Sequence, residues 1–209
     1  TLNQTDDKGL KQGYWVFYGK DKPNKGYCDT CKIEEGTYLN NRKEGQWIKY
    51  YTDGVTPRII GTYKNGRPWG PYKKIGSNNR LAEIGTFERG KQLGDLVKYD
   101  TCGKVVYSGF FNGEGKKHGW QRYYYPTCHC ADSTTDYLEA EINYENGVAR
   151  SLFRYWLSGC PKEKLFYAED GRVTSKQVFE DTCATNDCME YLHPKPPIDP
   201  EPPIKPPKF

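Results

Sequence analysis

The fold is decided by a short phrase that the chain repeats, and its clearest copy reads Gly61-Thr62-Tyr63-Lys64-Asn65-Gly66-Arg67-Pro68-Trp69-Gly70-Pro71-Tyr72. Other copies begin Gly36-Thr37-Tyr38 and Gly85-Thr86-Phe87. When the copies are aligned on their second glycine, that glycine falls at positions spaced 25, 24 and 25 residues apart: Gly45, Gly70, Gly94 and Gly119. A period of this size is typical of an array of stacked structural units.

Each copy of the phrase predicts a β-hairpin. Gly-Thr-Tyr alternates as strands do, and Asn65-Gly66 predicts a type I′ turn, which needs positive φ at both central residues. On the returning strand, the second glycine and the aromatic residue two positions later should share one face, which we assign to the core. We expect a glycine there because a neighbouring ring can then lie against the backbone.

The pattern Gly-x-Trp-x-x-Tyr, a turn, and then Gly-x-Tyr-x-Asn-Gly-x-x-x-Gly resembles the MORN-type repeat in its bacterial variant form, from Gly13 to Trp156. The resemblance implies an all-β fold, in which stacked β-hairpin repeats form an elongated antiparallel sheet. It also implies a non-catalytic scaffold or binding module, so we predict that the protein is not an enzyme.

The repeat pattern divides the chain into four parts. Residues 1–12 are a polar lead-in, residues 13–172 the repeat domain and residues 173–192 a C-terminal cap. Residues 193–209 form a proline-rich extended tail, which favours polyproline II. We predict that this tail acts as a strap onto a partner.

Composition narrows the classes of function. Hydrophobic residues make up 35% and aromatic residues 15%, which suits a thin sheet with a row of rings as its core. The net charge of +4 comes from 31 basic and 27 acidic residues, and this near balance does not predict a nucleic-acid partner. No run approaches the length of a transmembrane helix, so we predict no membrane span.

Eight cysteines, an even number, predict disulfides and therefore an exported protein, periplasmic or extracellular, whose signal peptide has been removed. Eight cysteines allow many pairings. We favour Cys28–Cys31, Cys183–Cys188 and two bridges among Cys102, Cys128, Cys130 and Cys160.

Two other interpretations of the cysteines stay open at this point. Cys28-Asp29-Thr30-Cys31 has the spacing of a redox pair, but the βαβ context of such motifs is missing. Cys128-His129-Cys130 contains zinc-type ligands, but their spacing is too tight for the usual site. We therefore predict no metal and no cofactor. No catalytic motif stands out, and we expect the acidic pair Glu34-Glu35 to be solvated.

The candidate partner-binding residues fall into two groups. Four tyrosines adjoin positions assigned to the core, so their rings should point outward, and the apolar tail residues could enter a groove of a partner. These candidates are Tyr51, Tyr123, Tyr125, Tyr155, Pro197, Ile198, Pro203, Ile204 and Phe209.

From these features we expect a protein–protein interaction subunit of a cell-envelope assembly. It would dock on or plug the periplasmic side of an outer-membrane protein translocon, and the narrower resemblance is to the plug subunit of type 9 secretion. The alternative is a module that binds glycans or lipid headgroups on an exposed aromatic face. Trp15 and Trp47 fall at predicted core positions, which disfavours this alternative.

Overall fold

The protein is built from antiparallel β-strands, which confirms the all-β prediction. The computed structural model describes residues 2–126 and 136–181, and the chain divides into two compact units, residues 1–116 and 117–209. The described residues contain fourteen strands, two short 3-10 turns and no α-helix. None of the helical segments in these described ranges is long and apolar enough to cross a membrane.

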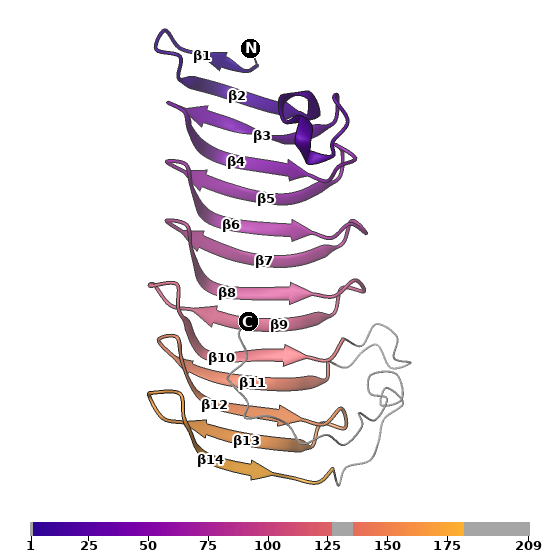
Figure 1. Ribbon diagram of the computed structural model, residues 1–209, viewed down its shortest axis with the longest axis vertical. Helices are drawn as coiled ribbons and strands as arrows, with labels where there is room; N and C mark the ends of the chain where they lie inside the picture. Colours follow the sequence, from indigo (N-terminus) through magenta and orange to yellow (C-terminus); the bar gives the residue numbers. More distant parts are fainter. Residues whose placement is uncertain (1, 127–135, 182–209) are drawn as a thin grey trace. The chain divides into compact units, whose positions relative to one another are not determined.

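In the first unit, each strand pairs with the next one along the chain, so the strands lie side by side in sequence order (Figure 1). The strands of this unit are β1 (Gln4–Thr5), β2 (Lys11–Tyr18), β3 (Lys32–Leu39), β4 (Arg42–Tyr50), β5 (Pro57–Lys64), β6 (Arg67–Ile75), β7 (Leu81–Glu88), β8 (Lys91–Tyr99) and β9 (Val105–Phe111).

The second unit follows the same rule, with antiparallel pairing between consecutive strands. Its strands are β10 (Lys117–Tyr124), β11 (Leu138–Glu145), β12 (Val148–Tyr155), β13 (Pro161–Tyr167) and β14 (Val173–Val178). The core of this unit is a cluster of Ile142, Leu152 and Leu165, one from each of β11, β12 and β13. These three residues lie opposite one another in the register, so the apolar contacts run across the strands.

The predicted type I′ turn is present between β5 and β6. Asn65 has φ of 55° and Gly66 has φ of 77°, and Lys64 pairs with Arg67 across the two-residue loop. The backbone N–H of Gly66 also donates to the carbonyl of Lys43 in the preceding hairpin, at 2.9 Å. Because the turn matches the right-handed twist of the strands, it fixes the register of the hairpin.

The second glycine of the repeat has a different role from the one that we predicted. Gly45, Gly94 and Gly119 have φ of 67°, 66° and 66°, and a Cβ on any of them would meet nothing within 4 Å. Between the pairs Gly36–Trp47 and Thr37–Glu44, β4 advances three residues while β3 advances one, which makes a bulge. The glycine is therefore needed for its left-handed backbone at the bulge, and no ring lies against it.

The ring lies instead against the first glycine of the repeat. A Cβ on Gly36 would lie 2.4 Å from a ring carbon of Trp47, and Trp47 is only 1% exposed. Gly85 is crowded in the same way, since a Cβ on it would lie 2.7 Å from the Gln92 amide nitrogen and 3.0 Å from the ring of Tyr72, whereas a Cβ on Gly61 would approach only the Tyr72 Cβ, at 3.3 Å. The absence of a side chain at this position is what lets the large ring lie flat on the sheet.

An aromatic seam forms the core of the first unit at its N-terminal end. It consists of Trp15, Phe17, Tyr38, Trp47 and Tyr63. Each ring contacts the next one in this order, and the ring centroids of the contacting pairs lie 4.9 to 6.4 Å apart. Lysine side chains cover the rings, and the nearest contact places the Lys43 ammonium 3.9 Å from the Trp47 ring centroid. The seam thus combines ring packing with cation–π contacts.

The segments on either side of the predicted repeat domain both carry strands. Residues 1–12 were expected to be a loose lead-in, but Gln4 pairs with Gln12 and Thr5 with Lys11, so this part carries β1. The side chain of Asn3 explains the pairing, since its amide donates to the carbonyl of Val16 and its oxygen accepts from the Val16 N–H. At the other end, β14 lies in the segment that was assigned to the cap.

Candidate functional site

A groove crosses one face of the first unit, from β4 to β8. It encloses 480 Å³, and its lining includes Ile60, Ile84 and Val97. Ile84 is 37% exposed, although it lies in the middle of a strand. Within residues 2–116, no helix and no second sheet covers this face, so the branched side chains of the groove meet solvent.

The strand register explains why these apolar residues form one line. Ile60 lies opposite Lys73, Lys73 opposite Ile84, and Ile84 opposite Val97 on successive strands. Side chains that lie opposite one another in paired strands point to the same face. We call Ile60, Ile84 and Val97 the apolar row. It lies on the face opposite Trp47, because Ile60 and Gly61 are neighbours and Gly61 pairs with Trp47.

Polar side chains form the wall beside the apolar row. Gln46, Thr62, Thr86 and Asp95 line the groove, and Gln46 lies opposite Thr62 in the register. Tyr72 is the one aromatic residue of the lining, but its pairing with Gly61 places its ring on the other face, where its hydroxyl donates to Glu83 at 2.6 Å. The groove therefore offers a line of branched aliphatic groups next to a line of hydrogen-bonding groups.

A second hollow, the disulfide-loop pocket, lies where residues 19–31 join β2 to β3. This loop contains two 3-10 turns, Gly19–Asp21 and Pro23–Lys25, which lie beside the end of β2 (Figure 1). The pocket encloses 390 Å³. It is lined by Lys22, Lys25, Tyr27, Ile33, Glu34, Lys49, Thr52 and Arg58.

Several contacts hold the loop in place. A disulfide joins Cys28 to Cys31, and the backbone N–H of Gly19 donates to the Cys31 carbonyl at 2.9 Å. The hydroxyl of Tyr27 donates to the carbonyl of Tyr50 at 2.7 Å. Gly54 lies so close that a Cβ on it would be 2.7 Å from the Cα of Cys31. The loop is thus seated on the turn between β4 and β5.

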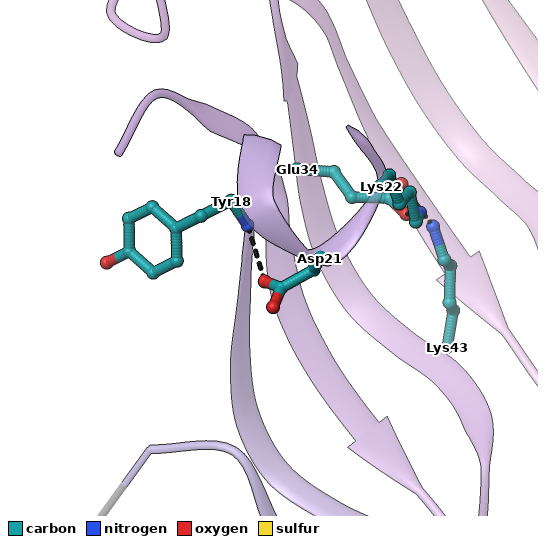
Figure 2. Close-up of polar contacts among 5 residues, drawn as sticks. All are labelled: Tyr18, Asp21, Lys22, Glu34 and Lys43. Carbon is teal, nitrogen blue, oxygen red and sulfur yellow. Dashed lines mark hydrogen bonds and ion pairs between the residues drawn. The ribbon is translucent and has the colours of Figure 1, made fainter. Parts of the chain in front are cut away.

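Glu34 is the acidic group of this pocket. Its carboxylate accepts hydrogen bonds from Lys22 at 3.0 Å and from Lys43 at 2.7 Å, and Figure 2 shows both side chains reaching it. Burial alone would raise the pKa of Glu34, but the two lysines outweigh that effect and hold the pKa below its ordinary value. Next to this group, Asp21 accepts a hydrogen bond from the backbone N–H of Tyr18, which fixes the start of the first 3-10 turn (Figure 2).

Both members of the acidic pair are buried, so the prediction that Glu34-Glu35 is solvated was wrong. Each is 7% exposed. Glu35 points to the opposite face from Glu34 and accepts hydrogen bonds from Tyr50 and Lys32. The reason is that paired lysines and a tyrosine hydroxyl offset the cost of removing both carboxylates from water.

A third hollow, the turn cluster, collects positive charge at the hairpin turns. It is lined by Arg42, Lys64, Asn65, Arg67, Trp69 and Arg89. The Arg42 guanidinium donates to the Asn65 side chain at 3.2 Å, and the Lys64 ammonium lies 5.0 Å from the Trp69 ring centroid. These groups are largely exposed, so the cluster forms a basic edge.

The four tyrosines predicted to point outward are covered to a large extent. Tyr125 is buried, with 8% exposure, so that prediction was wrong for its ring. Tyr51, Tyr123 and Tyr155 are half-buried. Their role in binding a partner remains a prediction.

The tyrosine hydroxyls show why the rings are covered. The Tyr51 hydroxyl donates to the Ile75 carbonyl at 2.7 Å, and the Tyr125 hydroxyl donates to the Tyr155 carbonyl at 2.9 Å. The Tyr155 hydroxyl donates to Glu141 at 2.8 Å, and Tyr123 packs against the core of the second unit. Burial, followed by the bond to Glu141, raises the pKa of Tyr155 to about 12. Each of these three hydroxyl bonds ends on a group of another strand, which keeps the ring on the sheet.

The described cysteines are all oxidised. The predicted Cys28–Cys31 disulfide is confirmed, with Cα atoms 5.0 Å apart. Cys102 and Cys160 are disulfide-bonded too. The described part of the chain contains no cluster of three or more His, Cys, Asp or Glu residues that could hold a metal ion.

Other predicted residues lie outside the described residues. These are the tail residues Pro197, Ile198, Pro203, Ile204 and Phe209, and the loop and cap residues Cys128, His129, Cys130, Cys183 and Cys188.

One buried polar residue was missed by the sequence analysis. Gln121 is 0% exposed and occupies the position two residues after the second glycine, where the other units have Trp47, Tyr72 or Leu96. Its amide donates to the carbonyl of His118 at 3.3 Å. The alignment of repeats contained the signal, because a polar residue stands in an otherwise apolar column.

The comparison with known proteins does not assign the chain to a family. No model of a known protein family matches it, and no curated protein matches it.

Proposed function

We propose that the protein is a non-catalytic interaction subunit that binds an extended, apolar segment of a partner protein in the groove of its first unit. The observation that carries this proposal is the apolar row. Branched aliphatic side chains lie in register across β5, β7 and β8, on a sheet face that nothing in residues 2–116 covers. Lys73 of β6 lies between Ile60 and Ile84 in this register, and an exposed, largely apolar surface of this kind is typical of a binding site.

The dimensions of the groove suit an extended peptide. Neighbouring strands lie about 4.8 Å apart, so the five strands from β4 to β8 span roughly 19 Å. An extended chain advances about 3.3 Å per residue, so about six residues cross the groove. In such a segment alternate side chains point the same way, and these would contact Ile60, Ile84 and Val97.

The polar wall favours a peptide over a lipid or a glycan. Thr62, Thr86 and Gln46 offer hydrogen-bonding groups beside the apolar row, where the backbone of a peptide has N–H and C=O groups to pair. An alkyl chain would leave these groups without a partner, which costs free energy. A glycan needs an accessible ring to stack on, whereas the ring of Tyr72 lies on the other face of the sheet, opposite Gly61, and is only 8% exposed.

The wider setting of this function is part of the same proposal. The disulfides and the resemblance to MORN-type repeats support an exported protein of the cell envelope. Docking on the periplasmic side of an outer-membrane translocon, as a plug subunit of type 9 secretion would, rests on that resemblance alone. The proline-rich tail would add a second point of attachment.

Selection of displayed peptides tests the groove. Random ten-residue peptides would be selected on the immobilised full chain, and the enriched peptides would be measured against two variants, Ile84→Glu and Leu39→Glu. Leu39 is an exposed apolar residue, with 55% exposure, that does not line the groove. We expect enriched peptides with alternating apolar residues, whose affinity falls at least about tenfold for Ile84→Glu only, because a charge would be placed against an apolar side chain.

Two results would contradict this proposal. If no peptide is enriched, or if both variants bind the peptides as well as the parent chain does, the groove is not a peptide site. Glycan and lipid arrays would then test the alternative function.

A further inference from the structure

The disulfide-loop pocket is built by the one long departure from the repeat pattern in the first unit. Other hairpins of this unit are joined by short turns, whereas residues 19–31 make a loop with its own disulfide. The loop brings Lys22 and Lys25 over the ends of β3 and β4, where they meet Lys49 and Arg58. A loop that serves only to connect two adjacent strands needs none of these groups.

The pocket carries more positive charge than its one carboxylate can neutralise. Glu34 is the only acidic residue of the lining, and it is shared by Lys22 and Lys43. Lys25, Lys49 and Arg58 form no ion pair within residues 2–126 and 136–181. Elsewhere in the unit, buried acids hold the lysines around them, as Glu83 does with Lys74 at 2.8 Å.

The crowding of positive charge affects Lys43. Burial is the main cause that lowers its pKa, and the nearby charges of Lys49 and Lys22 lower it further, against the opposing effect of Glu34. An anion in the pocket would relieve this repulsion. Lys22, Lys43 and Lys49 repel one another, and each of them would attract an anion that binds in the pocket.

We infer that the disulfide-loop pocket binds a phosphate-bearing small molecule, with Arg58, Lys25 and Lys49 as its contacts. A phosphate group carries up to two negative charges and three acceptor oxygens, so it can pair with several cations at once, whereas a single carboxylate neutralises one. The planar guanidinium of Arg58 can donate two parallel hydrogen bonds to such a group.

The remaining lining limits the rest of the ligand. The 390 Å³ of the pocket exceeds the needs of a phosphate ion and lies in the range of small-molecule sites. Ile33 supplies an apolar surface, and Thr52 supplies a hydroxyl. These groups fit a small polar body attached to the phosphate, such as a sugar. The pocket is separate in its lining from the groove, so this inference does not depend on the proposed function.

The disulfide has a defined task in this arrangement. Lys22 and Lys25 lie in residues 19–31, the loop whose last four residues are closed by the Cys28–Cys31 disulfide, and Gly19 and Gly54 fix this loop to the sheet. Removing the disulfide would leave every cation in the chain but would loosen the wall that carries two of them. Binding should therefore depend on the covalent link as well as on charge.

Calorimetric titration of the full, oxidised chain at pH 7 and low salt tests the inference. The probes are inorganic phosphate, glucose 6-phosphate and glucose. We expect both phosphates to bind at one site and glucose not to bind. If only glucose 6-phosphate binds, the sugar contacts are essential; if inorganic phosphate binds equally well, the ligand is recognised by its phosphate alone.

Variants separate this pocket from general surface charge. Arg58→Gln and Lys25→Gln each remove one contact and should weaken phosphate binding by about tenfold. The matched control Arg67→Gln makes the same change in charge at the turn cluster and should leave binding unchanged. The double variant Cys28→Ser/Cys31→Ser should also weaken binding by several-fold. The inference is overturned if neither phosphate binds, or if Arg67→Gln weakens binding as much as Arg58→Gln does.

Discussion

Replacing Gly36 by alanine is the sharpest test of how the first unit is held together. The added Cβ would lie 2.4, 2.5 and 2.6 Å from three carbon atoms of the Trp47 indole, where ordinary contact begins at 3.4 Å. The clashing group is a buried, rigid ring, so it cannot turn away as the end of a flexible side chain could. The indole must withdraw from the sheet by about 1 Å.

The cost follows from what the ring contacts. Overpacking a well-filled core costs about 1–3 kcal/mol. Withdrawal also stretches the 3.0 Å hydrogen bond from the Trp47 indole N–H to the Thr37 carbonyl, worth about 1 kcal/mol. It also disturbs the cation–π contact with Lys43, worth roughly 1 kcal/mol or more. We expect a loss of about 3 kcal/mol in unfolding free energy, which lowers the melting temperature by roughly 6–12 °C.

Thermal and urea unfolding, followed by tryptophan fluorescence, measure this loss. Gly61→Ala is the matched control, because it occupies the same place in the next unit and its Cβ would lie 3.3 Å from the Tyr72 Cβ. It should cost less than about 1 kcal/mol. In a Trp47→Leu background, Gly36→Ala should become much cheaper, because the clashing ring is gone. If Gly36→Ala costs no more than Gly61→Ala, the ring is not what requires glycine here.

Two further predictions concern the backbone and the buried acid. Gly45→Ala should lower the free energy of unfolding by about 1–2 kcal/mol although its Cβ meets no atom, because φ of 67° is strained for alanine. Gly45→Asn should lower it less. Equal unfolding midpoints for the parent chain and both variants would contradict this role of the glycine. Because the pKa of Glu34 is held below 4.5, its ion pairs stabilise the fold above that pH, and this stabilisation is lost as the pH falls through the lowered pKa. The stability difference between the parent chain and Glu34→Gln, measured by urea unfolding from pH 7 to pH 2.5, should therefore shrink below pH 4.5, and a constant difference would argue against the ion pairs.

Much of the fold could be predicted because its signals are local. Asn65-Gly66 specifies a type I′ turn through the conformations that these two residues tolerate. The recurrence of Gly-Thr-Tyr indicates a strand, although the triplet stands near the end of the strand and not at its start, as Gly61-Thr62-Tyr63 does in β5. These signals are contained in a few adjacent residues, so no knowledge of the other strands is needed to read them.

The role of the second glycine could not be predicted from alternation alone. Gly45 and Trp47 are two residues apart, which places them on one face of a regular strand. The bulge between Glu44 and Trp47 breaks that regularity, and the left-handed conformation of Gly45 is its cause. Alternation cannot be carried across a residue with positive φ.

The candidate site could not be predicted from the sequence for a different reason. Ile60, Ile84 and Val97 lie in different repeats, and each looks like an ordinary strand residue in its own sequence window. Only the register of four strands brings them into one row. Likewise, Glu34 meets lysines that are 9 and 12 residues away, so a local view interprets it as solvated.

Site-specific photo-crosslinking in the cells that make the protein tests the central claim most directly. A photoreactive amino acid would be placed at Ile84 in the groove, and at Leu39 as the control position outside it. The account predicts a discrete adduct at position 84 that is absent at position 39, and whose peptide map shows an extended apolar segment of another protein. An absence of adducts at position 84, or the same adducts at both positions, would contradict it.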